Sequence, residues 1–204
     1  MTDAQQQLQT ELLTRLDLME TMVREGRKTH EYWGWGFLLW GAAYLIAIGW
    51  SHSAYIPNAA WPVTMIAAAV VTAAVGAAGK HAHRQTTLSR SVSAIWIAVG
   101  TALFLYGFSA AISGHSEPHS FYATVEILLG VANFASALVL RWSVQFTVAL
   151  IWASAAVASC FAASTAILPV FVAASLLGNI GFGLYLTYLE RRDRSRDRTQ
   201  VQHG

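Results

Sequence analysis

The stretch of this chain that decides the fold is residues 142–189, which read WSVQFTVALIWASAAVASCFAASTAILPVFVAASLLGNIGFGLYLTYL and carry no charged side chain. Its 48 residues are enough for two apolar helices of about 20 residues each, the length that crosses a bilayer, with a turn between them. Residues 32–79 form a second uncharged stretch, and residues 91–140 form a third that is interrupted only by Glu117 and Glu126. The three stretches predict an all-α membrane protein, a six-transmembrane-helix bundle built from three helical hairpins.

The overall composition supports this prediction. Hydrophobic residues make up 55% of the 204-residue chain and charged residues only 12%, whereas a soluble globular domain carries about 25% charged residues. This fraction of charged residues is too low for a protein surface exposed to water. The lipid bilayer is therefore the expected partner. We divide the chain into an N-terminal cytoplasmic amphipathic helix (1–31), a six-span transmembrane domain (32–189) and a basic cytoplasmic tail (190–204).

Turn residues place the ends of the spans, which we predict over residues 33–50, 61–79, 92–112, 121–140, 146–163 and 169–188. Proline is tolerated in the first turn of a helix, because the first N–H groups have no partner within the helix. We expect all four prolines in the connections or in such first turns, namely Pro57, Pro62, Pro118 and Pro169.

The basic residues predict the orientation. All 13 Lys and Arg residues lie before span one, in the connections from span two to span three and from span four to span five, or after span six. Because cytoplasmic loops are enriched in Lys and Arg, both termini are expected on the cytoplasmic side, as in a bacterial inner-membrane protein, with span one as an uncleaved signal anchor. This asymmetry accounts for the basic residues, so we predict no nucleic-acid partner.

An amphipathic helix is expected before span one. Leu12, Leu16, Met19 and Val23 recur at spacings of four, three and four, which places them on one helical stripe. Such a stripe can lie on the membrane surface or on the protein's own loops. Alternatively, it can bind a protein partner or a second copy of the chain.

Glu126 is the most informative residue within the predicted spans. It lies five residues inside span four, at a depth where a charged carboxylate is costly and where ionisable groups are functional candidates. We expect a carboxyl group that is locked by hydrogen bonds, or one that borders water and handles a proton, cation or polar solute. Tyr44, Tyr106, Ser109 and Ser159 lie at comparable depth, and Asn133 and Asn179 add intramembrane amides.

The loops on the outer side contain a second group of candidates, His52, His115, Glu117 and His119. The sequence His-Ser-Glu-Pro-His would place His115, Glu117 and His119 on one side of an extended segment, and Pro118 argues against a helix there. Imidazole and carboxylate ligands suit zinc, nickel or copper. A divalent metal on the outer surface is thus the one cofactor that the sequence offers, and a pH-sensitive surface is the alternative.

The sequence contains none of the motifs of common enzyme active sites, such as Gly-x-Ser-x-Gly, His-Glu-x-x-His or a phosphate-binding glycine loop. We therefore expect no enzyme. The leading hypothesis is a sensor, assembly factor or accessory component that uses its cytoplasmic helix for contact. The alternative is a small proton-, cation- or solute-transporting protein centred on Glu126.

Overall fold

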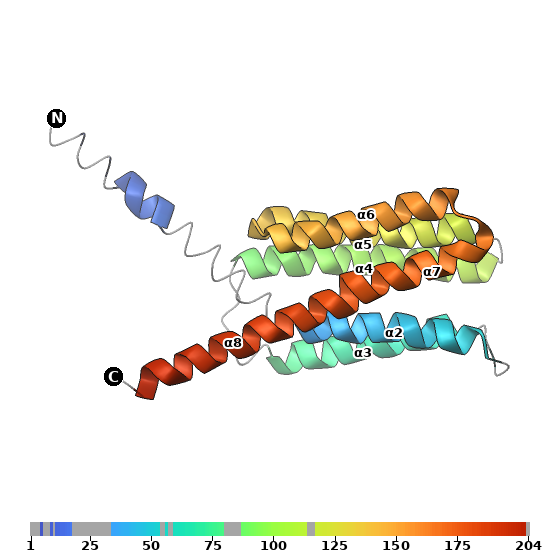
Figure 1. Ribbon diagram of the computed structural model, residues 1–204, viewed down its shortest axis with the longest axis horizontal. Coiled ribbons are helices and arrows are strands. Elements are labelled where there is room, and N and C mark those ends of the chain that lie inside the picture. Colours follow the sequence, from blue (N-terminus) through green and yellow to red (C-terminus); the bar gives the residue numbers. More distant parts are fainter. Residues whose placement is uncertain are drawn as a thin grey trace.

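The computed structural model describes residues 5, 9, 11–17, 34–53, 56, 59–79, 87–113 and 117–202, and these residues form helices and short connections without a β-strand. Among the described residues six helices are long and apolar enough to cross a membrane, so the chain is a multi-pass α-helical membrane protein (Figure 1). Five of them are α2 (Gly34–Ser51), α3 (Ala60–Gly79), α4 (Thr87–Ser113), α5 (Pro118–Leu140) and α6 (Ser143–Phe161). The sixth is one long helix composed of α7 (Ser164–Ser175), the π-helical segment η2 (Leu176–Gly181) and α8 (Phe182–Gln202).

The last helix differs most from its predicted span. It begins at Ser164, so Pro169 lies inside α7, and the prediction that Pro169 occupies a first turn is wrong. The connection from α6 consists of Ala162 and Ala163, both in extended conformation. Neither residue is a turn former by type, and for that reason the sequence did not reveal the turn.

Capping groups explain where α5 begins and ends. The Glu117 side chain accepts hydrogen bonds from the N–H groups of His119 and Ser120, and Pro118 occupies the first turn, where its missing N–H costs nothing. At the other end Arg141 adopts a left-handed conformation with φ 48°, and the next residue, Trp142, donates its N–H to the Ala137 carbonyl at 3.0 Å. This cap ends α5 within two residues of α6, which packs along it more extensively than any other helix does.

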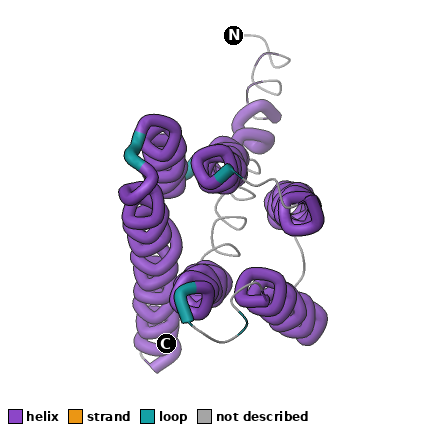
Figure 2. The backbone as a smooth tube through the Cα atoms, turned by 90° about the vertical axis from the view of Figure 1, so that its right-hand side faces the viewer, coloured by secondary structure: helices purple, strands orange, loops and turns teal. Residues whose placement is uncertain are grey.

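The last helix crosses between two groups of helices. Helices α4, α5 and α6 form one group and α2 and α3 form the other, and in Figure 1 the last helix runs diagonally across both. Its first half, α7, packs mainly against α5 and α6, whereas α8 packs against α2. The end-on view shows the same helix inclined along one side of the bundle (Figure 2).

Glycines permit the close crossing of α2 and α8. A Cβ on Gly34 would lie 2.9 Å from Leu186 Cβ, and one on Gly183 would lie 2.9 Å from the Gly34 carbonyl oxygen. Both distances are too short for a side chain, so the two backbones meet here as they do in other small-residue contacts within membranes. The four-residue spacing of Ala68, Thr72 and Gly76 also resembles such a contact face, but a Cβ on Gly76 would meet nothing within 4 Å.

Candidate functional site

Seven polar side chains are buried in the interior of the bundle, and we call them the polar row. They lie on α5, α6, α7 and η2, the segments that form the centre of the fold. Its members are Glu126, Asn133 and Ser136 on α5, Gln145 and Ser159 on α6, Ser175 on α7 and Asn179 on η2. A buried polar group destabilises a fold unless it has a hydrogen-bonding partner. Seven buried polar side chains in one interior therefore indicate a role other than packing.

The polar row extends along most of the membrane-spanning length. At a rise of 1.5 Å per residue, Glu126, Asn133 and Ser136 lie about 12, 22 and 27 Å along α5 from Pro118. Helix α6 runs the opposite way, so Ser159 lies near the end of the bundle where α5 begins and Gln145 lies near the other end. Polar groups thus occur at successive depths between the two ends.

Glu126 is wholly buried, with an exposed fraction of 0%. Neither carboxyl oxygen has a hydrogen-bond partner among the residues that the structure describes. The Ser159 hydroxyl faces this carboxyl group from α6 but does not reach the geometry of a hydrogen bond. The network of hydrogen bonds expected of a structural lock is therefore missing in the described part of the chain.

The two buried amides lie on different helices. Asn133 donates from Nδ2 to the Leu129 carbonyl at 2.9 Å, a bond within its own helix, while its Oδ1 has no partner among the described residues. Asn179 lies on η2 next to α2, where a Cβ on Gly41 would approach its Cβ to 2.9 Å. The polar row therefore extends to the place where the last helix changes its packing partner from α5 and α6 to α2.

Trp152 fixes the position of η2 against α6. Its exposed fraction is 0%, and a Cβ on Gly178 would lie only 2.5 Å from its Nε1. The glycine is required because any side chain there would occupy the volume of the indole ring. A π-helical turn inside an α-helix is rare and is often found at functional sites. Here it brings Gly178 against Trp152 and Asn179 into the interior.

Aromatic rings from four helices, α2, α3, α5 and α6, surround the buried Phe171 of α7. The centroid distances to its ring are 5.7 Å from Tyr44, 6.3 Å from Trp61, 5.1 Å from Tyr122 and 6.0 Å from Trp152. We call these five side chains the aromatic cluster. Tyr122 precedes Glu126 by one helical turn, so the two residues share one face of α5.

Two of the hydroxyl groups expected at the depth of Glu126 lie elsewhere. Tyr106 donates to the Ser120 carbonyl at 3.3 Å and stacks on Phe121 with centroids 5.7 Å apart. Ser109 is exposed on α4. Of the four candidates, Ser159 faces Glu126, and Tyr44 reaches the same region through the aromatic cluster.

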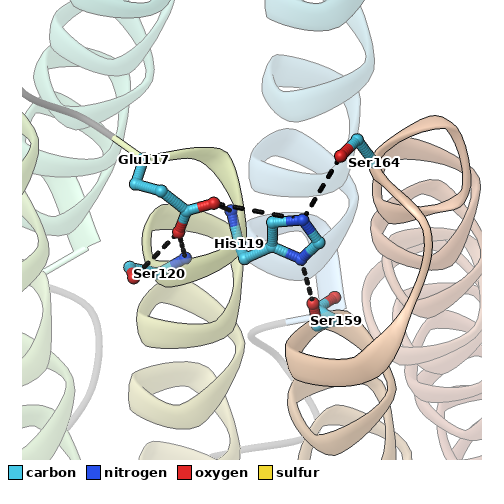
Figure 3. A network of polar contacts seen from close by, with 5 residues as sticks. All are labelled: Glu117, His119, Ser120, Ser159 and Ser164. Carbon is cyan, nitrogen blue, oxygen red and sulfur yellow. Dashed lines mark hydrogen bonds and ion pairs between the residues drawn. The ribbon is translucent and has the colours of Figure 1, made fainter.

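A polar network joins three helix ends where α5 begins (Figure 3). His119 Nδ1 lies 3.0 Å from the Ser159 carbonyl oxygen, and its Nε2 lies 3.4 Å from Ser164 Oγ. Because a carbonyl only accepts, the neutral ring carries its proton on Nδ1, and Nε2 accepts from Ser164. His119 thereby ties the start of α5 to the end of α6 and the start of α7.

Glu117 holds the same corner together as the N-cap of α5. The Ser120 N–H donates a hydrogen bond to the Glu117 carboxylate at 2.8 Å. This bond, together with the bonds from the His119 N–H and the Ser120 hydroxyl, lowers the pKa of Glu117 below the usual 4.5. Glu117 itself is extended, but the prediction that the extended segment continues to His119 is wrong, because Pro118 begins a helix instead of preventing one.

The lowered pKa predicts a pH-dependent contribution of Glu117 to stability. A carboxyl group whose pKa is lower in the folded state stabilises the fold above its unfolded pKa, and the contribution disappears as the pH falls through the folded pKa. We expect Glu117→Gln to melt below wild type at pH 7 and at the same temperature at a pH well below 4.5. Thermal melting of both proteins in detergent tests this, and an equal difference at both pH values would contradict it.

The candidate metal ligands are only partly brought together. Glu117 Oε1 lies 3.9 Å from His119 Nε2. His52 lies at the end of α2, where its Nδ1 is 2.8 Å from the Ile48 carbonyl oxygen, and His115 lies outside the described residues. Within the described ranges, no group of three His, Cys, Asp or Glu side chains could hold a metal ion. Metal binding that includes His115 stays a prediction.

Sequence reasoning missed Trp152, Gln145 and Phe171 as parts of the interior. Spans five and six are apolar on all sides, so periodicity gave no signal for which face is buried. The segment Leu176–Gly181 did contain a signal, since Gly178, Asn179 and Gly181 are weak helix formers in an otherwise good helical stretch.

Comparison of this chain with protein-family models, with curated proteins and with solved structures finds no match. The functional argument therefore rests on the geometry of the polar row.

Proposed function

We propose that this chain is a small membrane transporter without enzymatic activity, which moves protons or another cation with Glu126 as the group that binds them. The observation that carries the proposal is the complete burial of the Glu126 carboxyl group without a hydrogen bond from the described residues. A structural carboxyl group would need such bonds to offset the cost of its burial. A carboxyl group that binds and releases a cation must be free of permanent partners.

The polar row supports the proposal by its extent. A cation that crosses an apolar bundle needs polar groups at several depths, because each apolar step costs it solvation. Ser159 and Glu126 provide such groups towards one end, Ser175 and Asn179 near the middle, and Ser136 and Gln145 towards the other end. An ionisable residue inside a membrane most often marks a pathway of this kind.

The interrupted last helix supports the proposal by its packing. Transporters commonly bind their substrates where a membrane-spanning helix departs from α-helical geometry. In this chain η2 lies between α7, which packs on α5 and α6, and α8, which packs on α2. A change at η2 would move α2 and α8 relative to α5 and α6, and we propose that this movement opens the site to either side in turn.

The test is a flux measurement on the wild-type protein. The full chain is reconstituted into liposomes that contain an impermeant pH dye, and a potassium gradient with valinomycin sets the membrane potential. We expect protons to enter several times faster than in protein-free liposomes made in the same way. If they do not, the same vesicles are tested for sodium and potassium uptake, and flux equal to that of protein-free liposomes for all three ions would reject the proposal.

We also propose the finer topology, which is three helical hairpins in the inner membrane of a bacterium with both termini in the cytoplasm. The segregation of all 13 Lys and Arg residues supports it. After Cys160 is replaced with serine, we expect Ser53→Cys to react with an impermeant thiol reagent in intact cells, and Ser195→Cys to react only after lysis. Labelling of Ser195→Cys in intact cells would contradict this orientation.

A second candidate function, a sensor, assembly factor or accessory component, is favoured by the N-terminal helix. Residues 11–17 are helical, and Leu12, Leu13 and Leu16 are all more than half exposed. The other stripe residues, Met19 and Val23, lie outside the described residues. We expect that changing Leu12 and Leu16 to serine removes any crosslinked dimer or partner complex without affecting ion flux. An unchanged crosslinking pattern would reject this candidate.

A further inference from the structure

We propose that the end of α8 is a binding surface for the headgroups of anionic phospholipids, formed by the arginines that continue its lipid-facing side. We call residues 190–198 the charged segment. The inference goes beyond the proposed function and does not depend on transport. It is carried by the helical register of α8, which separates the arginines of the charged segment from its acidic residues.

Helix α8 has two different sides before the charged segment begins. Leu186 is wholly buried and faces α2, where a Cβ on Gly34 would lie 2.9 Å from its Cβ. Leu184 and Tyr188 have exposed fractions of 57% and 62%, and Tyr185 is also exposed. In a membrane-spanning helix the exposed side is the side that faces lipid. We call the two sides of α8 bundle-facing and lipid-facing.

The acidic residues of the charged segment continue the bundle-facing side. Helix α8 runs without a break to Gln202 and extends past the other helices of the bundle (Figure 1), so its register holds throughout the charged segment. Residues that are 4, 7 or 11 positions apart lie on the same side of an α-helix. The residues at these distances from Leu186 are Glu190, Asp193 and Asp197.

The arginines continue the lipid-facing side. Arg191 follows Leu184 by 7 residues, and Arg192 and Arg196 follow Tyr185 by 7 and 11 residues. The two remaining arginines, Arg194 and Arg198, lie between the two sides. The lipid-facing side of the charged segment therefore carries positive charge, and the acidic residues that would repel an anionic lipid lie on the other side.

The first arginines of the charged segment lie at the depth of the headgroups. The last membrane-spanning helix, Ser164–Arg192, has 29 residues. At a rise of 1.5 Å per residue it is about 43 Å long, comparable to a bilayer with its headgroups, which is about 40–45 Å thick. Arg191 and Arg192 are exposed at its end. Tyr188, one turn earlier, is of a residue type enriched at the membrane interface.

An anionic headgroup is the partner that fits this surface. The guanidinium group of arginine binds phosphate through two parallel hydrogen bonds. Each basic residue near an anionic membrane surface strengthens binding about fivefold. Arginines that served only to orient the chain would need no particular side of the helix, because orientation depends on how many basic residues a connection contains. The separation of charges therefore favours lipid binding as a second role.

Native mass spectrometry of the full chain in detergent tests the inference. Phosphatidylglycerol is the anionic lipid, and phosphatidylcholine with the same acyl chains is the neutral comparison. We expect wild type to bind phosphatidylglycerol at least about fivefold more tightly. Glutamine at Arg191, Arg192 and Arg196 should reduce this ratio to less than about twofold, whereas lysine at the same positions keeps the charge and should preserve most of it. Equal affinity of wild type for the two lipids would overturn the inference.

A charge-exchange variant separates the position of the charges from their number. Arg192→Asp with Asp193→Arg, and Arg196→Asp with Asp197→Arg, keep the composition and net charge but move two arginines to the bundle-facing side. We expect this variant to lose the preference for phosphatidylglycerol. A preference equal to that of wild type would show that only net charge matters and would overturn the inference. If the fourfold variant does not fold, the exchange at residues 196 and 197 alone, beyond the span, provides the same comparison.

Inorganic phosphate distinguishes a lipid headgroup from a free anion. Phosphate should displace phosphatidylglycerol no more than sodium chloride of equal ionic strength does, because the acyl chains hold the headgroup at the membrane surface. Stronger displacement by phosphate would indicate a site for free anions and would overturn the assignment to lipid. Cation flux through the bundle is measured separately, so the failure of either proposal leaves the other standing.

Discussion

Glu126→Gln is expected to reduce cation flux in reconstituted liposomes to the level of protein-free liposomes. The amide has nearly the same shape as the carboxyl group and keeps most of its hydrogen-bonding capacity, but it can neither release a proton nor carry a negative charge. If Glu126 binds the transported cation, no other acidic residue of the described spans can replace it, because the spans contain no second Asp or Glu until Glu190 in α8. Flux under the same potassium gradient provides the measurement.

Stability measured on the same preparations separates loss of function from loss of fold. Because the Glu126 carboxyl group is buried without a hydrogen bond from the described residues, Glu126→Leu should stabilise the bundle by about 1–3 kcal/mol, the usual cost of an unpaired buried polar group. It should also abolish flux. Glu11→Gln, the matched change at an exposed carboxylate, should alter neither quantity. Wild-type flux in Glu126→Gln would remove Glu126 from the mechanism.

Gly178→Leu is expected to prevent the last helix from packing on α6. The Cβ would lie 2.5 Å from Trp152 Nε1 and 3.0 Å from its Cε2, and Trp152 is wholly buried, so the ring has no room to move aside. Overpacking of a core costs about 1–3 kcal/mol and occasionally more, and the large leucine side chain places this variant at the upper end. We expect a melting temperature about 6–12 °C lower than that of wild type, measured on the purified protein in detergent.

Gly100→Leu provides the matched control for this prediction. Gly100 lies in the middle of α4, where a Cβ would meet nothing within 4 Å. The same substitution in a lipid-facing position should change the melting temperature by less than about 2 °C. An equal decrease in the melting temperature of the two variants would indicate that leucine destabilises the bundle at any glycine position. The contact between Gly178 and Trp152 would then have no special role.

The helices themselves were predictable because each span is decided by local composition. The charge-free stretches predicted six spans, and the described residues contain six helices of the required length and hydropathy. Five of them begin and end close to the predicted residues. The start of the sixth was missed because Ala162 and Ala163 form a turn without glycine or proline. The expectation that an extended segment continues from Glu117 to His119 was wrong, because proline at the first position of a helix favours the helix.

The sequence by itself determined that the chain has six stretches long and apolar enough to cross a membrane and that one of them carries a carboxyl group away from its ends, since hydropathy and rise per residue are properties of one helix at a time. Only the tertiary structure decided which faces meet. It placed Ser159 opposite Glu126, Trp152 against Gly178 and Phe171 at the centre of the aromatic cluster. Trp152, Phe171 and Gly178 lie in segments that are mainly apolar around their whole circumference. Which side of each helix is buried depends on shape and on the close approach of glycines, and neither leaves a periodic signal in the sequence.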